Sequence, residues 1–156
     1  MGYLAKLVIF FILNFGALGI GGLFTGKGVK SLWYETLHKA PWTPPGFVFG
    51  LAWSLIMICF SFFMVNIKTE VGTLSVKLIY GLFIIQWFLN VMWNPLFFKY
   101  HMAMIALICI CLLFIIVAVF LYLGYKDSVL NAVLMVPYFF WLIIAISLNV
   151  YIVLKN

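Results

Sequence analysis

The sequence predicts an all-α membrane protein, a bundle of five transmembrane helices. Of its 156 residues 68% are hydrophobic and only 8% are charged, and the mean hydropathy is +1.27. Charged residues make up about a quarter of an ordinary soluble domain, so the bilayer must be the solvent of this chain. Membrane strands alternate polar and apolar residues, whereas the apolar runs here are continuous, which favours helices.

Five apolar runs are long enough to cross the hydrocarbon core, which takes about 20 helical residues. We expect the first run to be a retained helix, because it is too long for a signal peptide and no small-residue cleavage site follows. What remains is short turns and one longer, lid-like connection, so the length predicts a single domain over residues 1–156. The predicted helices lie near 4–24, 46–66, 78–98, 103–124 and 132–154, and the lid-like loop is 25–45.

The first run is dense in small residues, with Ala17 and Gly21 four positions apart on one face. Small residues at this spacing let helices approach closely in lipid. The pattern favours tight packing inside the bundle, and a dimer seam or the floor of a pocket stay open as alternatives.

The connection 25–45 concentrates tryptophans, prolines and polar side chains that the rest of the chain lacks. A plain membrane anchor needs no stiff aromatic connection, so we expect a lid over something bound between the helices. Pro44-Pro45 suits the start of the second helix, because proline tolerates the first turn. Phe49 and Trp53 then fall on one face of that helix.

Neutral amides are the main polar groups inside the predicted helices. Such groups are costly in hydrocarbon and usually face the bundle interior and a partner. No acid or lysine lies near the centre of a helix, which argues against a proton pump, an ion-coupled transporter or a voltage sensor. The run 103–124 has almost no polar side chain and is predicted to be lipid-facing or purely structural. The amides are Asn14, Gln86, Asn90, Asn94 and Asn149.

Most catalytic machinery is absent from the sequence. The three acids, Glu35, Glu70 and Asp127, lie far apart in different loops, and both histidines, His38 and His101, are predicted in loops on the same side. No Cys/His cluster has the spacing of a metal site. We therefore expect neither a metal centre nor an acid–base mechanism driven by the protein.

The net charge of +6 comes from nine lysines, which fall at the ends of the predicted helices. Basic residues there flank the lipid and set orientation, so they do not indicate nucleic acid. An odd number of helices puts the termini on opposite sides. The lid side has five lysines and the N-terminal side has four, which favours a cytoplasmic lid and C-terminus by one residue. The lysines on the N-terminal side are Lys6, Lys68, Lys77 and Lys126, and those on the lid side are Lys27, Lys30, Lys39, Lys99 and Lys155.

Aromatic side chains are abundant, and membrane tryptophans most often sit in the interfacial belt. That interpretation covers Trp33 and Trp93. Trp53 and Trp141 lie inside their helices, on faces that also hold small or polar residues. Together with Asn90 they are predicted to line an apolar pocket with a few polar groups, the usual form of a small-molecule site. Such walls suit a large, flat, conjugated ligand through offset stacking.

Four separated motifs combine tryptophan, proline and polar residues. They are Trp33-Tyr34-x-x-Leu37-x-Lys39-x-Pro41-Trp42-x-Pro44-Pro45, Phe49-x-x-x-Trp53, Trp93-Asn94-Pro95-x-Phe97-Phe98, and Pro137-Tyr138-x-x-Trp141-x-x-x-Ala145-x-x-Leu148-Asn149. These motifs resemble the tryptophan-rich sensory protein (TspO) family, which is related to the mitochondrial translocator protein, formerly the peripheral benzodiazepine receptor. The resemblance spans residues 33–149 and agrees in order and spacing. One departure is Ala40, where a second proline is expected beside Pro41, which makes the loop less stiff.

The resemblance implies a five-helix bundle, usually a homodimer, that binds porphyrins such as protoporphyrin IX without a covalent bond. It also implies binding of isoquinoline carboxamide and benzodiazepine drugs beneath the first loop. Bacterial relatives are associated with light- and oxygen-dependent breakdown of protoporphyrin. The absence of arginine and the short termini suggest a bacterial member in the cytoplasmic membrane.

Carried over residue by residue, the resemblance gives a lid of Tyr34, Trp42 and Pro45. The implied pocket walls are Phe49, Trp53, Asn90, Trp141 and Ala145. In our hypothesis, Trp53 and Trp141 are the catalytic pair, acting as quenchers of the excited porphyrin, electron donors or traps for reactive oxygen. The candidate contacts for the porphyrin propionates are Lys30, His38 and Lys39, with solvated interfacial charges as the alternative. Either His38 or His101 could ligate the iron of heme.

Three functions stay open at this point: a photochemical tetrapyrrole-degrading protein, a tetrapyrrole carrier or sensor, and a transporter of porphyrins or sterols. The small bundle shows neither repeats nor coupling-ion residues, so it supports the transporter least. Leu148-x-x-Tyr151-x-x-x-Lys155 fits a cholesterol-contact pattern that is loose and common by chance. The physiological ligand, the dimer face and sterol binding are left open.

Overall fold

In the computed structural model, which describes residues 2–68 and 76–156, the chain is almost wholly helical, and these residues form no strand. Within them, five helices are long and apolar enough to cross a membrane, which confirms the predicted fold class. Glu70, which the sequence places in a loop, lies outside the described residues. The helices are α1 (Tyr3–Gly28), α2 (Leu32–Thr36), α3 (Gly46–Asn66), α4 (Val76–Phe98), α5 (Ala103–Asp127) and α6 (Val129–Lys155).

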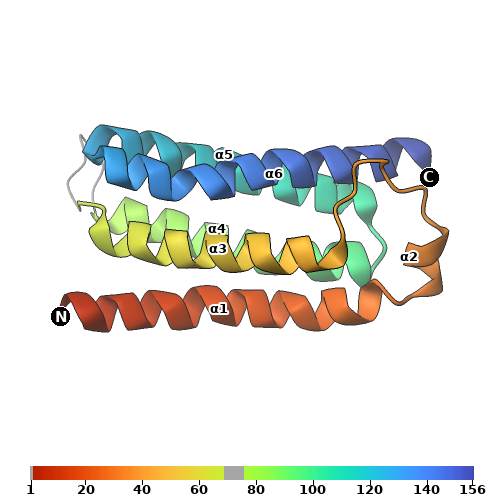
Figure 1. The fold of residues 1–156 in the computed structure, drawn as a ribbon, viewed down its shortest axis with the longest axis horizontal. Coiled ribbons are helices and arrows are strands. Elements are labelled where there is room, and N and C mark those ends of the chain that lie inside the picture. Colours follow the sequence, from red (N-terminus) through yellow and green to blue (C-terminus); the bar gives the residue numbers. More distant parts are fainter. Residues whose placement is uncertain (1, 69–75) are drawn as a thin grey trace.

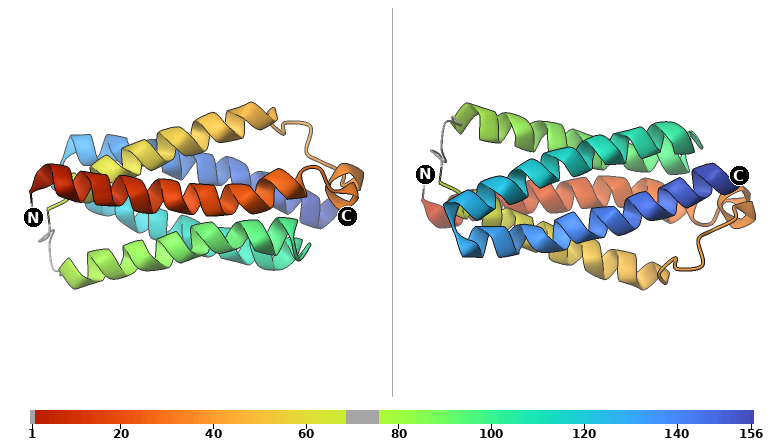
Figure 2. Two further views of the ribbon diagram at one scale, coloured as in Figure 1. Left: turned by 90° about the horizontal axis from the view of Figure 1, so that it is seen from below. Right: turned by 90° about the horizontal axis from the view of Figure 1, so that it is seen from above.

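The five long helices form a ring in which each packs against two neighbours, in the order α1, α3, α6, α5, α4 (Figures 1 and 2). Successive long helices run in opposite directions. The C-terminus and α2 therefore lie together at one end, which we call the lid end, and the N-terminus lies at the other (Figure 1). The lid, defined as residues 29–45, crosses from the end of α1 past the end of α6 to the start of α3.

The helix α1 is one turn longer than the sequence predicted, because Thr25-Gly26-Lys27-Gly28 continue it. Its buried residues Ala17 and Gly21 face inward. A Cβ on Gly21 would come within 2.5 Å of Asn94 Nδ2 on α4. These small residues therefore pack tightly inside the bundle and also line a cavity between the helices, and they do not form an outward-facing seam.

The half of the bundle away from the lid is filled by aromatic rings. Phe60 and Phe63 of α3 are fully buried and meet Phe120 of α5 edge-on, with ring centroids 5.5 and 5.7 Å apart. Val117 and Phe120 of α5 are equally buried. The helix α5 thus turns one face to the core and leaves Ile108 and Leu112 exposed on the other. It is not the most lipid-facing helix, because α1 and α4 bury a smaller share of their most apolar stretch.

Neutral polar pairs join the helices inside the bundle, as the sequence predicted. Asn14 Nδ2 of α1 donates to Ser61 Oγ of α3 (2.9 Å). Gln86 Nε2 of α4 donates to the Tyr138 hydroxyl of α6 (2.7 Å). Each pair fixes the register of two helices without placing a charge in the membrane, although Gln86 Oε1 is buried without a partner among the described residues.

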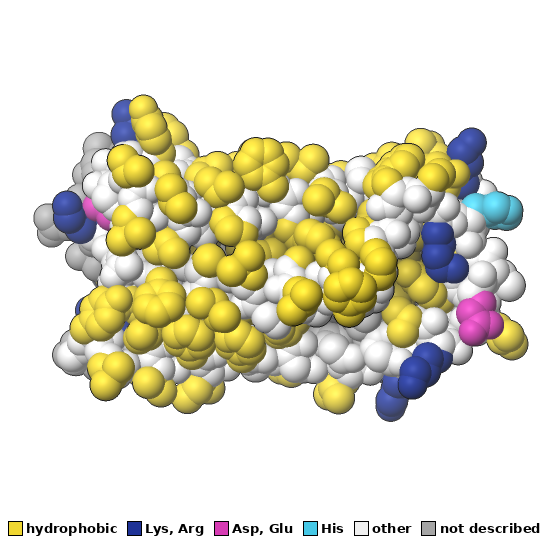
Figure 3. Space-filling view, viewed as in Figure 1, with side chains coloured by type: hydrophobic (Ala, Val, Ile, Leu, Met, Phe, Trp, Pro, Cys, Tyr) yellow, Lys and Arg dark blue, Asp and Glu magenta, His cyan; other side chains and the backbone are white. Residues whose placement is uncertain are grey.

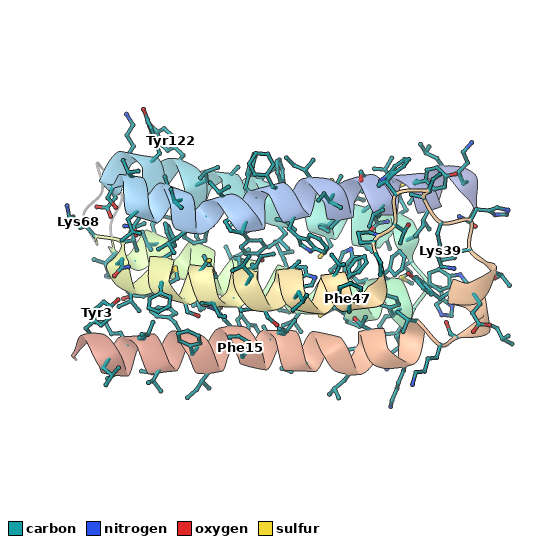
Figure 4. The ribbon with its side chains drawn as sticks, in the orientation of Figure 1. Tyr3, Phe15, Lys39, Phe47, Lys68 and Tyr122 are labelled. Atoms are coloured by element: carbon teal, nitrogen blue, oxygen red, sulfur yellow. The ribbon has the colours of Figure 1, made fainter. Side chains whose placement is uncertain are left out.

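Charged side chains gather at the two ends of the molecule, and hydrophobic side chains cover the middle of the face shown in Figure 3. Lys39 lies at the lid end, whereas Tyr3 and Lys68 lie at the opposite end (Figure 4). There Lys68 pairs with Asp127 at 3.7 Å. This distribution agrees with five membrane-spanning helices whose ends reach the headgroups.

Candidate ligand-binding site beneath the lid

The lid begins with a tight cap on α2. Ser31 Oγ accepts from the backbone N–H of Tyr34 (3.2 Å) and donates to the carbonyl of Gly28 (2.6 Å). A serine at this position satisfies the first free N–H groups of a helix. Further along, Thr43 closes a turn by donating from its hydroxyl to the carbonyl of Ala40 (2.7 Å). These local bonds hold the lid in one path although Ala40 replaces a proline.

The lid is tied to α6 at two points. The backbone N–H of His38 donates to Asn156 Oδ1 (2.9 Å), and Asn156 Nδ2 donates back to the His38 carbonyl (3.3 Å). Trp42 Nε1 donates to Ser147 Oγ (3.1 Å), and its ring meets Tyr151 edge-on. Both contacts lie at the surface. The lid is also held by packing, because Trp33, Tyr34 and Leu37 lie against a buried cluster that includes Phe97 and Phe98.

Two cavities lie beneath the lid and share three aromatic walls, Phe49, Trp93 and Phe98. The central cavity, of about 350 Å³, lies between α1, α3 and α4. The upper cavity, of about 60 Å³, lies between the lid, α4 and α6. Because the same rings separate them, the two cavities are neighbouring parts of one site.

The central cavity owes its space to glycines on α1 and α3. Its polar side chains include Thr25 of α1 and Asn90 and Asn94 of α4. Asn94 Oδ1 accepts from Thr25 Oγ1 (2.7 Å), whereas the side-chain amide of Asn90 has no hydrogen bond to any described residue. Asn90 is therefore the amide that a ligand can use. The glycines in the walls are Gly21, Gly22, Gly26, Gly46 and Gly50.

The two tryptophans predicted to share a wall do not. Trp53 lines the central cavity and meets Tyr138 edge-on at 5.9 Å. Trp141 is only 8% exposed and lies behind Phe49, whose ring it meets edge-on at 5.3 Å. Its indole N–H has no partner in the described part of the chain. An unpaired buried donor is costly, and Phe49 is the side chain that separates it from the cavities.

The upper cavity brings together the lid and α6. Tyr34 and Lys39 line it from the lid and Ala145 from α6. Lys39 Nζ lies 4.6 Å from the centroid of the Tyr34 ring, close enough for a cation–π contact. Burial raises the pKa of the Tyr34 phenol above its usual value of 10.0, so the hydroxyl is a neutral hydrogen-bonding group at physiological pH.

Other predicted residues lie outside both cavities. Trp42 is 53% exposed and lies against the surface of α6, and Pro45 caps α3 without lining a cavity. Lys30 and His38 are exposed. The structure thus places Lys39, but not Lys30 or His38, where it could meet a bound carboxylate.

Neither histidine faces the site. His101 stacks on Trp33 at a centroid distance of 4.2 Å, and the backbone of His38 is bonded to Asn156. These positions give no support to axial ligation of heme iron by either residue. Across residues 2–68 and 76–156, no three His, Cys, Asp or Glu side chains gather in a way that could hold a metal ion.

Some lining residues were not predicted. Trp93 was interpreted as a belt residue, yet it lines both cavities and donates from Nε1 to Asn149 Oδ1 (3.2 Å). Phe98 and Asn94 belong to the same motif as Trp93, which was the signal that could have found them. The remaining unpredicted walls of the upper cavity are Thr43, Phe97, Leu148, Asn149 and Ile152.

The fold and the site define a multi-pass integral membrane protein with an aromatic cavity beneath one loop. The chain belongs to the TspO/MBR family, whose sequence model matches residues 7–154. It is similar to the tryptophan-rich protein TspO of Archaeoglobus fulgidus, with 32% identity over 93% of this chain and 94% of that protein. The human translocator protein is 31% identical over 83% of this chain and 78% of its own length. Protein CrtK of Rhodobacter capsulatus is 26% identical over 94% of this chain and 89% of its own.

Proposed function

We propose that this protein binds tetrapyrroles, protoporphyrin IX among them, beneath the lid and promotes their degradation by light and oxygen. The observation that carries the proposal is the central cavity, whose aromatic walls Phe49, Trp53, Trp93 and Phe98 surround the free amide of Asn90. Small-molecule sites of about 300–1,000 Å³ are typically apolar with few polar groups. The same walls would accept small hydrophobic drugs of the benzodiazepine-receptor type.

The electrostatics of the site support a ligand with one polar edge. Hydrocarbon and aromatic groups form most of the walls, and the cation Lys39 lies at the lid side. A porphyrin carries its two carboxylates on one edge, so its ring would lie among the aromatic walls and its propionates would point toward the lid. The membrane that supplies such a ligand is, in our proposal, the bacterial cytoplasmic membrane, and the working unit is a homodimer.

The chemistry asks little of the protein's acids and bases. The excited porphyrin and oxygen supply the reaction, and the protein positions the ring and selects what reacts, as proteins generally do for pigment chemistry. Trp53 borders the cavity, and Trp141 lies one aromatic ring behind it. In this proposal the two tryptophans quench the excited ring, donate an electron to it or trap reactive oxygen.

Replacement of both tryptophans tests this role. We expect Trp53→Phe/Trp141→Phe to retain saturable porphyrin binding, because apolar aromatic walls remain, and to lose the specific photoproduct. The matched control is Trp33→Phe/Trp87→Phe, since neither residue lines a cavity. The measurement is absorbance and fluorescence of protoporphyrin IX under illumination in air. Product formation at the wild-type rate in the first variant would refute the role of the pair.

Replacement of the lid lysine tests the orientation of the ligand. We expect Lys39→Gln to weaken protoporphyrin IX binding up to about fivefold, because a partly exposed ion pair contributes up to roughly 1 kcal/mol, and to leave a neutral isoquinoline drug unaffected. Lys30→Gln, outside both cavities, is the control. Equal losses for the porphyrin and the drug would contradict a propionate contact at Lys39.

A further inference from the structure

A third cavity, the outer groove, lies on the lipid-facing side of the bundle at the lid end of α1 and α4. Its volume is about 440 Å³. Leu23 and Phe24 form its apolar floor, Lys27 and Lys99 stand at its rim, and the ring of Phe98 separates it from the central cavity. Leu23 is 68% exposed and both lysines are exposed, so the groove opens outward.

The helices α1 and α4 pack closely at the base of the groove. A Cβ on Gly28 would overlap the Phe98 side chain, so α1 and α4 touch at the base of the groove. One turn earlier, Thr25 Oγ1 donates to Asn94 Oδ1 at 2.7 Å. The spacing of Lys27 and Lys99 is therefore set by the backbone of two packed helices.

The depth of these residues matches the layers of a phospholipid. The 26 residues of α1 make a helix about 39 Å long, whereas the hydrocarbon core is about 30 Å thick. Lys27 in the last turn and Lys99 just after α4 thus lie at headgroup level. Leu23 and Phe24 lie about one turn deeper, at the level of the acyl chains.

The positive charge of the two lysines at the rim favours a negatively charged headgroup. Among residues 2–68 and 76–156, no carboxylate lines the groove. The ion pair between Lys68 and Asp127 lies at the opposite end of the molecule. Lysines at helix ends are commonly just solvated, but here two of them flank a hollow with an apolar floor.

We propose that the outer groove binds an anionic phospholipid. The headgroup phosphate lies between Lys27 and Lys99, and one acyl chain lies along Leu23 and Phe24. Lysine is a point-charge donor that suits phosphate oxygens, and anionic lipids are attracted to basic segments at the membrane surface. The site is separate from the tetrapyrrole cavity and does not depend on the function proposed above.

Lipid titration of the detergent-solubilised protein tests the site. Phosphatidylglycerol should raise the unfolding temperature at lower concentrations than phosphatidylcholine. In Lys27→Gln/Lys99→Gln the phosphatidylglycerol requirement should rise about 30-fold, because each lysine near an anionic lipid contributes roughly a fivefold preference. The matched control, Lys6→Gln/Lys77→Gln, removes two lysines at the other end and should respond like the wild type. If the double variant is unstable, the single variants Lys27→Gln and Lys99→Gln replace it, and each should need about fivefold more phosphatidylglycerol than the wild type.

Two further measurements test whether the apolar floor of the groove contributes to binding and whether free phosphate can replace the lipid. Leu23→Ser should weaken phosphatidylglycerol without removing a charge, and inorganic phosphate should stabilise the wild type little. An equal loss in both double variants would show non-specific attraction and overturn the proposal. Stabilisation by inorganic phosphate as strong as that by phosphatidylglycerol would also overturn it, in favour of a free-anion site.

Discussion

Two glycines near the end of α1 differ in what surrounds them. A Cβ on Gly28 would overlap the Phe98 side chain, whereas one on Gly26 would meet nothing within 4 Å. We expect Gly28→Ala to lower stability by about 1–3 kcal/mol through overpacking, and Gly26→Ala to be neutral or slightly stabilising. Thermal unfolding of both variants in detergent measures the difference, and equal midpoints would contradict the close contact of α1 and α4.

Tyr34 provides a pH-dependent test of the lid. Burial raises the pKa of its phenol above 10.0, so the folded protein favours the neutral form. The associated stability is present in full below pH 10 and is lost as the pH rises through the raised pKa, because the unfolded chain loses the proton first. The tyrosinate absorbance of the wild type minus that of Tyr34→Phe should titrate above the ordinary tyrosine range. Titration at or below pH 10 would place Tyr34 in solvent.

At the scale of elements, the lid depends on α6 for its position. We expect Asn156→Ala to loosen it, because both hydrogen bonds to the His38 backbone are lost. Amide hydrogen exchange should rise across residues 37–45 and stay unchanged in α3 and α6. Lys155→Ala, next in sequence but without a contact to the lid, is the control. Unchanged exchange in Asn156→Ala would mean that Trp42 and Ser147 hold the lid alone.

Sequence patterns predicted the helices better than the residues that line the cavities and the core between them. Apolar runs revealed five spans because each must satisfy its own backbone in lipid. They could not show that α5 turns Val117 and Phe120 into the core, since lipid and core favour the same residues. Helical spacing likewise found Trp53 and Asn90, but not that Phe49 stands between Trp141 and the cavities. The position of Phe49 depends on its rotamer and on which helices are neighbours in the bundle, and neither can be read from a single apolar run.

At the scale of the whole molecule, the two ends carry different charge. The lid end has five lysines against Glu35, and the described residues at the other end have four against Asp127. Basic residues favour the cytoplasmic side, so we expect the lid to face the cytoplasm. In intact cells, an impermeant thiol reagent should label Lys6→Cys, and Lys155→Cys only after permeabilisation. The reverse pattern would place the lid outside, and the native cysteines, all within helices, set the background.

Binding of protoporphyrin IX to two glycine variants of α1 tests the central claim most directly. A Cβ at either Gly19 or Gly22 meets nothing within 4 Å, but only Gly22 lines the central cavity. Gly22→Leu should fill the cavity and weaken protoporphyrin binding at least about tenfold, or roughly 1.4 kcal/mol. Gly19→Leu should bind like the wild type in the same fluorescence titration. Equal affinities for the two variants would show that the porphyrin binds elsewhere and would contradict the account.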